Sequence, residues 1–321
     1  MLDGIDSDVP TKRFKMVNSY LDEQLENVDD RIKPAVRHLP DAGGKRLRPV
    51  LFLLLSEALG CDPEDVLPIA AGIESFHTST LVEDDHPDMD NDNMRRDVPT
   101  VHREFSPAES QLVSKILLSK AFCWISNANI EGDARLKCID SMDDVVEELC
   151  IGQKQDLRYE KNKDIGKAEY EEMISMKTAA IYEELSRMAY YVSDFGDEEN
   201  LDHLESFGHH LGMSFQMVDD VIDMQLSDTT GKDAFSDIVN KKITIVTVHA
   251  MNNDVPVFDE EIPVRNRVRM IRNAGSIEYG RSQAREHTEK AMYHLDQIES
   301  ENPHLIDIIK NITEYIVDRT K

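Results

Sequence analysis

The sequence predicts an all-α protein, and three observations support this fold class. Apolar residues recur at three- and four-residue spacing along most of the 321-residue chain, which is the period of an amphipathic helix. No stretch alternates apolar and polar residues over the length of a strand between hairpin signals. The 12 Pro and 14 Gly are too few for a disordered or turn-rich chain. We therefore expect one large helical domain over residues 1–321.

The helical segments follow one another along the chain. The helical period is present in residues 15–28, 50–60, 65–84, 110–130, 138–157, 170–192, 203–226 and 276–300. The third of these segments leads into an acidic cluster, and the seventh contains a second one. Two polar, turn-rich stretches interrupt the pattern, and we expect loops there: residues 226–242 and 252–266.

Acidic residues dominate the charge, with 63 Asp and Glu against 36 Lys and Arg and a net charge of −27. Such a surface repels nucleic acid and anionic membranes. The acids are spread over the whole chain, which we interpret as adaptation to a salty cytoplasm, as in a haloarchaeon, because salt screens their repulsion. An ordinary acidic cytosolic enzyme is the alternative.

The cysteines and the N-terminus indicate a cytoplasmic protein. Four cysteines show neither CxxC pairing nor framework spacing, as expected of reduced thiols. Residues 1–12 are acidic and lack the apolar core of a signal peptide. No apolar run reaches the length of about 18 residues that a transmembrane helix needs, so we expect no membrane insertion.

The first acidic cluster is LVEDDHPDMDNDNMRR, residues 81–96. It places six acids between Glu83 and Asp92 and follows them with two arginines. The second is FQMVDDVIDM, residues 215–224, where Asp219 and Asp223 are four apart and share one helix face. Its other residues are mostly apolar, and buried like charges call for a cation. Oxygen ligands without clustered His or Cys select Mg²⁺.

Basic residues lie near helix ends and polar loops along the same chain. They are found in GGKRLRP (43–49), at Arg95–Arg96, at Lys177, at Lys232 and at Lys241–Lys242. Arginine forks bind phosphate oxygens bidentately and lysine supplies a point charge, while Mg²⁺ is usually bound by carboxylates together with substrate phosphates. The sequence therefore predicts a magnesium-dependent polyphosphate site.

The ordered motifs resemble those of the trans-isoprenyl diphosphate synthases, the polyprenyl synthetase family, almost from end to end. They are GGKRLRP, His77, DDHPDMDNDNMRR, GQKQD (152–156), MKT (176–178), FQMVDDVID, GK (231–232) and SDIVNKK, with a late-helix likeness in GSIEYGRSQA. The resemblance implies a helical bundle around a deep central cavity, the isoprenoid synthase type I fold, usually as a homodimer. It implies a prenyltransferase that joins isopentenyl diphosphate head-to-tail to an allylic diphosphate, with three Mg²⁺ ions at each site.

The resemblance also implies residue roles. Metal ligands would be Asp84, Asp85, Asp90, Asp156, Asp219 and Asp223, with Asp88 competing with Asp90. The allylic diphosphate would be bound by Arg95, Lys177, Thr178, Gln216 and Lys232. Isopentenyl diphosphate would be bound by Lys45, Arg48, His77 and Arg96. Lys242 matches a substrate-binding lysine after the loop, and Lys241 replaces a common glycine. Catalysis would depend most directly on Asp84, Asp85, Asp219, Lys177 and Lys232.

Three positions depart from the family pattern without touching this set. Glu83 stands where a histidine is common, and Asp97 replaces a glycine after the arginine pair. Ser114–Lys115 occupies a place where Gly-Asp is usual. We expect them to affect loop shape and packing rather than the type of reaction.

Product length depends on residues before the first acidic motif. Ser79 lies five residues and roughly 7 Å up the helix from Asp84, and Thr80 follows it. In relatives that stop at fifteen carbons a bulky aromatic near here forms a floor, so the small residues predict geranylgeranyl diphosphate. Fifteen-carbon, twenty-five-carbon and longer products are alternatives, and Phe122 or Trp124 on the next helix could close the pocket instead.

Two other functions compete with this one. A class I terpene cyclase also binds Mg²⁺ and diphosphate, but it has one acidic motif of this kind and needs no isopentenyl subsite. A non-catalytic subunit would have lost acids from at least one motif, whereas both are intact here.

Overall fold

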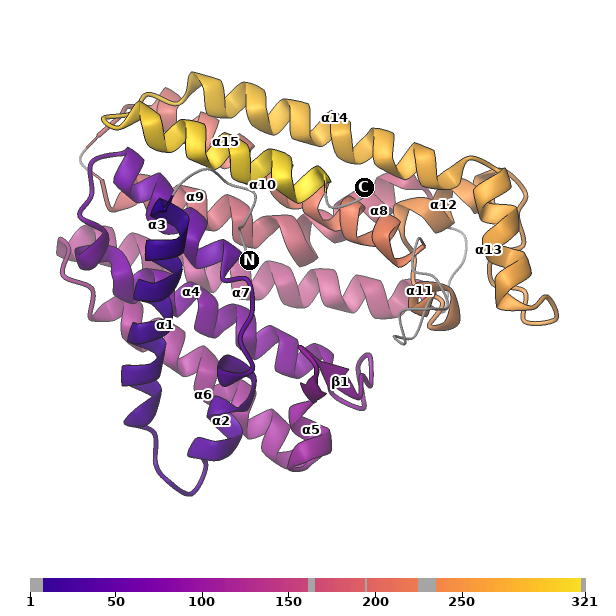
Figure 1. Cartoon of the computed structure of the whole chain (residues 1–321), viewed down its shortest axis with the longest axis horizontal. Coiled ribbons are helices and arrows are strands. Elements are labelled where there is room, and N and C mark those ends of the chain that lie inside the picture. Colours follow the sequence, from indigo (N-terminus) through magenta and orange to yellow (C-terminus); the bar gives the residue numbers. More distant parts are fainter. Residues whose placement is uncertain (1–7, 161–164, 194, 225–234, 319–321) are drawn as a thin grey trace. The chain divides into compact units, whose positions relative to one another are not determined.

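A computed structural model describes residues 8–160, 165–193, 195–224 and 235–318, and nearly all of its regular structure is helical (Figure 1). The all-α prediction is confirmed. In this part of the chain no helix is both long and apolar enough to cross a membrane. The predicted GK motif, with Lys232, lies outside the described residues.

The chain divides into two compact units, each built from three chain segments. Unit 1 comprises Met1–Met142, Leu185–Asp197 and Glu299–Ile309, and unit 2 comprises Asp143–Glu184, Glu198–Ile298 and Lys310–Lys321. Three of the five boundaries between these segments fall within helices. The prediction of a single domain around a central cavity stays a prediction.

Unit 1 contains α1 (Val9–Glu26), α2 (Lys33–Asp41), α3 (Leu47–Ala58), α4 (Pro63–Asp84), β1 (Met94–Arg95), β2 (Val98–Pro99), α5 (Val101–Glu104) and α6 (Pro107–Ser126). Helix α3 is buried all round, because every residue from Val50 to Leu55 has no exposed surface. Asp62 precedes helix α4 and caps it, because its carboxylate accepts the backbone N–H of Glu64 at 2.9 Å. The helix packs closely on α6, since a Cβ at Gly72 would lie 3.0 Å from the carbonyl oxygen of Ala121.

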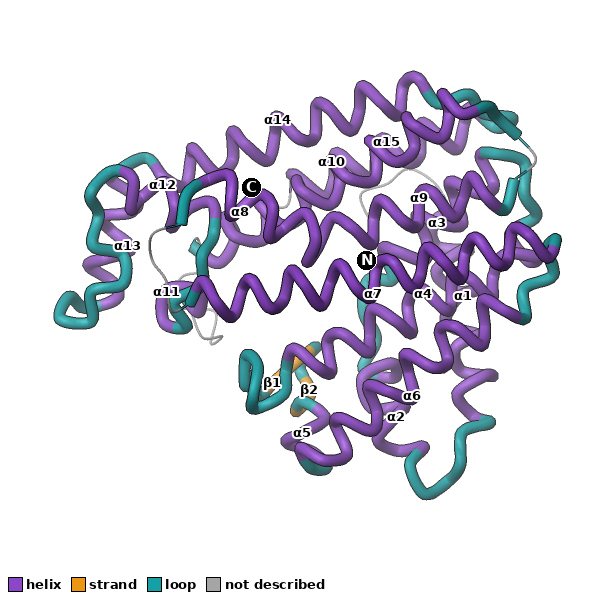
Figure 2. The backbone as a smooth tube through the Cα atoms, turned by 180° about the vertical axis from the view of Figure 1, so that it is seen from behind, coloured by secondary structure: helices purple, strands orange, loops and turns teal. Residues whose placement is uncertain are grey.

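Unit 2 contains α8 (Lys167–Ile174), the π-helix η1 (Ser175–Ala179), α10 (Glu198–Asp223), α11 (Ser236–Val239), α12 (Ile245–Asn252), α13 (Val264–Asn273) and α14 (Ser276–Gln297). Three helices are divided between the units: α7 (Gly132–Tyr159), α9 (Ala180–Tyr191) and α15 (Pro303–Asp318). Helices α10 and α14 pack along their length (Figure 2). The core beneath them is formed by residues such as Tyr170, Met217, Val221 and Ile245.

The helical segments read from the sequence lie in helices, with three corrections. Residues 170–192 are not one α-helix, because a π-helical turn interrupts them at Ser175–Ala179. The expected loop at 226–242 contains α11, and the one at 252–266 ends early because α13 begins at Val264. Helices α2, α5, α12 and α13 were not predicted because they span at most ten residues, too few for a clear period. Helix α15 has the period and was overlooked.

Candidate active site

The first acidic motif begins where α4 ends. Asp85, the residue that follows the helix, is only 1% exposed. Its Oδ1 accepts the Nε–H of Arg95 at 2.6 Å, whereas its Oδ2 has no hydrogen-bond partner among the described residues. Burial raises the pKa of Asp85 and the Arg95 guanidinium opposes this rise. A buried carboxylate oxygen without a donor fits a bound cation.

The other acids of the motif differ in placement. The backbone N–H of Asp90 donates to the carbonyl oxygen of Asp84 at 2.9 Å, and both residues are half-buried. Asp88 is exposed, with its carboxylate 3.7 Å from the His86 ring. The backbone thus folds back so that Asp90 lies next to Asp84, while the Asp88 side chain faces solvent.

A two-residue hairpin follows the acids and places the arginine pair. Arg95 on β1 faces Val98 on β2, and the loop residues Arg96 and Asp97 have φ of 53° and 64°. Two successive left-handed residues form a type I′ turn, whose second position favours glycine. Asp97 therefore occupies a position that a glycine would fill with less strain, as in the family pattern.

Arg96 is held against the GGKRLRP segment. Its guanidinium donates to the carbonyl oxygens of Leu39, at 3.1 Å, and Gly43. A Cβ at Gly44 would lie 2.8 Å from Cζ of Arg96, and Gly44 also has φ of +135°. Glycine is needed at position 44 for both reasons.

The GGKRLRP segment also contains a buried arginine that sequence reasoning missed. Arg46 is 4% exposed and donates to the carboxylate of Glu74 at 2.6 Å and to the carbonyl oxygen of Pro40 at 2.7 Å. Glu74 is itself 2% exposed and lies on α4, three residues before His77. The sequence held one indication of this ion pair, because Glu74 lies on an otherwise apolar face of its helix.

His77 lies among arginines in unit 1. Its Nε2 is 3.1 Å from the NH1 nitrogen of Arg48. Burial, and then the charges of Arg48 and Arg96, hold the pKa of His77 well below its ordinary value. The ring is therefore neutral and accepts from Arg48. We call Arg46, Arg48, Arg95 and Arg96 the arginine cluster. Lys45 is exposed beside it.

In unit 2 the MKT motif lies in the π-helical turn, which two glycines hold in place. A Cβ at Gly152 on α7 would lie 2.5 Å from the backbone nitrogen of Lys177, and one at Gly212 on α10 would lie 2.5 Å from Cα of Ala179. Both helices thus contact the backbone of the turn directly. π-Helical turns are frequent at functional sites, and this one carries Lys177 and Thr178.

Asp156 pairs with two of the predicted lysines of unit 2, Lys177 and Lys242. Its Oδ2 accepts from Lys177 Nζ at 2.5 Å and from Lys242 Nζ at 3.1 Å. Lys242 also binds Glu160 at 2.6 Å. Burial works to raise the pKa of Asp156, but the two ammonium groups together lower it. GQKQD and MKT, which are separate in sequence, thus form one ion-pair cluster.

A hydrogen-bonded chain links the same turn to the second acidic motif. Thr178 Oγ1 donates to Gln216 Oε1 at 2.8 Å, and Gln216 Nε2 donates to Asp220 Oδ1 at 2.9 Å. The other oxygen of Asp220 accepts from the Tyr170 hydroxyl at 2.6 Å and from the backbone N–H of Ile245 at 3.0 Å. Burial raises the pKa of Asp220 to about 6. A helical wheel of this segment could have revealed that Asp220 is buried, because it lies on the same apolar face as Met217.

Asp219 and Asp223, the acids predicted to bind metal, are half-buried on α10. Asp223 Oδ2 accepts the backbone N–H of Asp237 at 3.4 Å. Burial, and then the charges of Asp223 and Asp220, raise the pKa of Asp237 well above its ordinary value. Crowded carboxylates of this kind gain from a cation. Within the described residues, however, no three His, Cys, Asp or Glu side chains form a ready metal site.

The predicted chain-length residues lie on α4. Ser79 is 2% exposed and donates to the carbonyl oxygen of Phe76 at 2.7 Å, and Thr80 donates to that of His77 at 2.9 Å. Both hydroxyls are satisfied by their own helix. On α6, Trp124 packs edge-on against Tyr20 with ring centroids 5.9 Å apart, and Phe122 is half-buried.

Two of the residues that depart from the family pattern, Glu83 and Ser114, contact each other. The Ser114 hydroxyl on α6 donates to Glu83 Oε1 at 2.5 Å. The replacements at these positions therefore form one interaction between α4 and α6.

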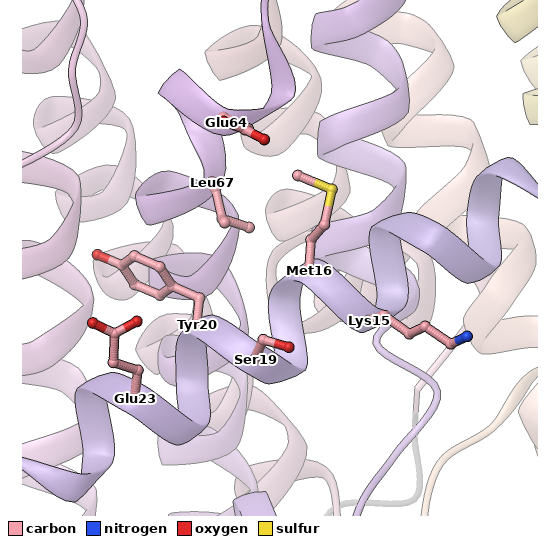
Figure 3. Close-up of a pocket in the computed structure, with 7 residues that line it drawn as sticks. All are labelled: Lys15, Met16, Ser19, Tyr20, Glu23, Glu64 and Leu67. Carbon is pink, nitrogen blue, oxygen red and sulfur yellow. The ribbon is translucent and has the colours of Figure 1, made fainter.

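A surface pocket lies between α1 and α4 of unit 1 (Figure 3). It is lined by Lys15, Met16, Ser19, Tyr20, Glu23, Glu64 and Leu67. None of these is a predicted site residue, so the pocket does not mark the candidate active site.

Comparison with known proteins agrees with the motifs. The family described as polyprenyl synthetase matches residues 29–266. The chain belongs to the polyprenyl synthetase family. The family prediction is thereby confirmed.

Relatives of this polyprenyl synthetase match along nearly their whole length. A geranylfarnesyl diphosphate synthase of Natronomonas pharaonis is 30% identical, with 99% of this chain and 98% of the relative covered. A geranylgeranyl pyrophosphate synthase of Geoglobus acetivorans is 32% identical, with 98% and 99% covered. The crystal structure of a geranylgeranyl pyrophosphate synthetase from Pyrococcus horikoshii has a TM-score of 0.88 at 31% identity, covering 97% of this chain and 98% of that one.

Proposed function

We propose that this polyprenyl synthetase is a Mg²⁺-dependent prenyltransferase that condenses isopentenyl diphosphate head-to-tail with allylic diphosphates. Geranylgeranyl diphosphate is the proposed main product, and a twenty-five-carbon product is the alternative. Membership in the family and the names of the similar synthases support this proposal.

One observation carries the proposal: in both units a predicted metal ligand is paired with a predicted diphosphate-binding cation. In unit 1 this pair is Asp85 with Arg95, at 2.6 Å, and in unit 2 it is Asp156 with Lys177, at 2.5 Å. Carboxylates interleaved with arginine and lysine suit a substrate that brings phosphate oxygens and metal ions together. The same kind of pair therefore occurs in each unit.

The chain's own groups would drive ionisation of the allylic C–O bond. Arg95, Lys177 and Lys242 would donate to the leaving diphosphate and stabilise the negative charge that develops on it. Mg²⁺, held by Asp84, Asp85, Asp90, Asp156, Asp219 and Asp223, would add further positive charge when bound. Asp90 is favoured over Asp88 as the third acid of the first motif, because its backbone is bonded to Asp84.

Isopentenyl diphosphate is proposed to be bound by Lys45, Arg48, His77 and Arg96. The neutral His77 ring accepts from Arg48 and so fixes the position of the guanidinium that is proposed to bind phosphate oxygens. Arg96 is held by two backbone carbonyls and presents its charge from a fixed position. The double bond of isopentenyl diphosphate would itself attack the allylic cation, so no protein nucleophile is needed. The departing diphosphate is the proposed base that takes the final proton.

The experiment is an incubation of purified protein with Mg²⁺, isopentenyl diphosphate and labelled allylic primers, followed by sizing of the products. The proposal predicts consumption of isopentenyl diphosphate and a twenty-carbon main product. A terpene cyclase would convert the primer without consuming isopentenyl diphosphate, and a non-catalytic subunit would turn over neither. Either result would contradict the proposal. Sedimentation of the same sample would test the proposed homodimer.

A substitution at Ser79 tests whether this residue determines the chain length of the product. Ser79→Phe is expected to shorten the main product to fifteen carbons while turnover continues, because the ring would fill the space beyond the small side chain. Phe122→Ala is the comparison variant, since Phe122 is the alternative floor. A wild-type product of fifteen carbons, or an unchanged product from Ser79→Phe, would contradict the assignment.

A further inference from the structure

Five of the eleven histidines lie along the line where α10 and α14 meet in unit 2. We call them the histidine seam: His203, His209 and His210 on α10, and His287 and His294 on α14. All five are half-buried. The proposed reaction uses none of them.

The seam contains two cross-helix pairs. His203 Nδ1 lies 3.0 Å from His294 Nδ1, and His210 Nδ1 lies 3.1 Å from His287 Nδ1. The two histidines on each helix are seven residues apart, about 10.5 Å along the axis, and the helices pair in antiparallel register. The rings of His210 and His294, from different pairs, also approach to 6.0 Å between centroids. The pairs thus form two neighbouring rungs.

The geometry of each rung suits two ligands of one metal ion. Two imidazole nitrogens that bind a tetrahedral ion at about 2.0–2.1 Å are separated by about 3.3 Å. The observed separations of 3.0 and 3.1 Å are close to this value, so binding would need only a small opening of each pair. Because both contacts use Nδ1, the rings already turn the same atom toward a shared point.

The surroundings of His210 and His287 favour the neutral ring, the form that binds metal. Burial, and then the rings of His287 and His209, lower the pKa of His210 to about 3. Burial, and then Lys290, lower that of His287 to about 4. The charged groups that face the seam are Glu183 on α9, 3.3 Å from His209, Lys167 on α8, and Glu286 and Lys290 on α14, which pair at 2.8 Å.

We propose that the histidine seam binds a divalent transition-metal ion of the Zn²⁺ or Ni²⁺ type and so clamps α10 to α14. Imidazole nitrogen is a suitable ligand for these ions, whereas carboxylate oxygens, as in the acidic motifs, suit Mg²⁺. In the described residues no three His, Cys, Asp or Glu side chains converge on one point. Each rung therefore supplies two protein ligands, and water completes the coordination.

The test is a titration of the full-length protein with Zn²⁺ and, separately, Ni²⁺ in a millimolar excess of Mg²⁺, which occupies the carboxylate sites. Calorimetry gives the affinity and a melting curve gives the stabilisation, because an ion that binds the folded state raises Tm. Matched variants are His210→Gln with His287→Gln, His203→Gln with His294→Gln, and all four together. His304→Gln, at an exposed histidine of α15, is the control.

The expected result is a Tm rise in the wild type and in the control. Each variant that lacks one pair should bind about half as many ions as the wild type, and the fourfold variant should show no rise. Absence of binding by the wild type, or wild-type binding by the fourfold variant, would overturn the proposal. If that variant does not fold, Cu²⁺ electron paramagnetic resonance on the wild type decides. Coupling to two imidazole nitrogens supports the site, and a signal from oxygen ligands alone overturns it.

Discussion

The second aspartate of each Asp-Asp pair is almost fully buried, but the two have opposite surroundings. Asp85 is 1% exposed, and one of its oxygens has no hydrogen-bond partner among the described residues. Asp220 is 3% exposed, and its two oxygens accept from Gln216, Tyr170 and the backbone of Ile245. The same residue pair in the two motifs thus contains, in one case, a buried carboxylate with an oxygen that accepts no hydrogen bond and, in the other, a buried carboxylate that joins helices.

Different parts of the fold hold the two motifs in place. In unit 1 the acids follow the end of α4, and a hairpin brings Arg95 to Asp85. In unit 2 the acids lie within α10, and Asp220 ties that helix to α8 through Tyr170 and to the start of α12 through Ile245. Asp219 and Asp223 are then presented by a helix whose position the buried Asp220 network fixes.

The largest expected effects are on turnover, at the acids proposed to bind metal. Asp84→Asn and Asp219→Asn should each lower kcat by about 10²- to 10³-fold, because a charge-stabilising group at the reacting centre is lost. Far-ultraviolet circular dichroism should remain that of the wild type. Near-normal turnover in either variant, or loss of the fold, would remove that motif from the metal site.

The arginine pair should separate the two substrates. Arg96→Ala is expected to raise KM for isopentenyl diphosphate, and Arg95→Ala that for the allylic primer. Each rise should be about ten- to a hundredfold, since a hydrogen bond to a charged group contributes about 1.5–3 kcal/mol. Steady-state kinetics with each substrate varied in turn measures both. Equal effects of the two changes on both substrates would show that there are no separate subsites.

Tyr170→Phe tests the structural role of Asp220 without changing a carboxylate. The change removes one of the donors to a buried oxygen, so the free energy of unfolding should fall by about 1–3 kcal/mol. Denaturant unfolding measures it, and Tyr279→Phe on the partly exposed side of the same core is the control. A loss of turnover with unchanged stability would place Tyr170 in the reaction instead.

The smallest effect is expected in the hairpin. Asp97→Gly should leave stability unchanged or raise it by less than about 1 kcal/mol, because glycine has no steric penalty in the left-handed region. Asp97→Val should lower it. Melting curves of both variants compare them, and a clear loss of stability in Asp97→Gly would mean that the aspartate side chain supports the turn.

The sequence predicted the helices and the motifs, which depend on residues close together in the chain. It did not predict the contacts between segments that are far apart in the chain. Helical periodicity predicted α4, α6, α10 and α14, and the motif order predicted the family. Asp156 and Lys177 were both singled out, but their ion pair depends on the approach at Gly152, which only the folded chain reveals. The π-helical turn was hidden because its residues fit a continuous helical period.

The buried polar residues that the sequence did not identify were missed for one physical reason. Arg46 and Glu74, or Tyr170 and Asp220, are 28 and 50 residues apart, and each group has meaning only as the partner of the other. A buried charge in a single sequence indicates that a partner exists, not which one it is. Glu83 and Ser114 are 31 residues apart, and the sequence likewise does not show that they contact each other.

The contrast between Asp85 and Asp220 is tested most directly by the rise in Tm that Mg²⁺ and inorganic diphosphate together produce. The wild type and Asp220→Asn should both show this rise, although Asp220→Asn starts from a lower Tm. Asp85→Asn should fold and show no rise, because the oxygen proposed to bind the metal is replaced. An equal rise in Asp85→Asn, or no rise in a folded Asp220→Asn, would contradict the account.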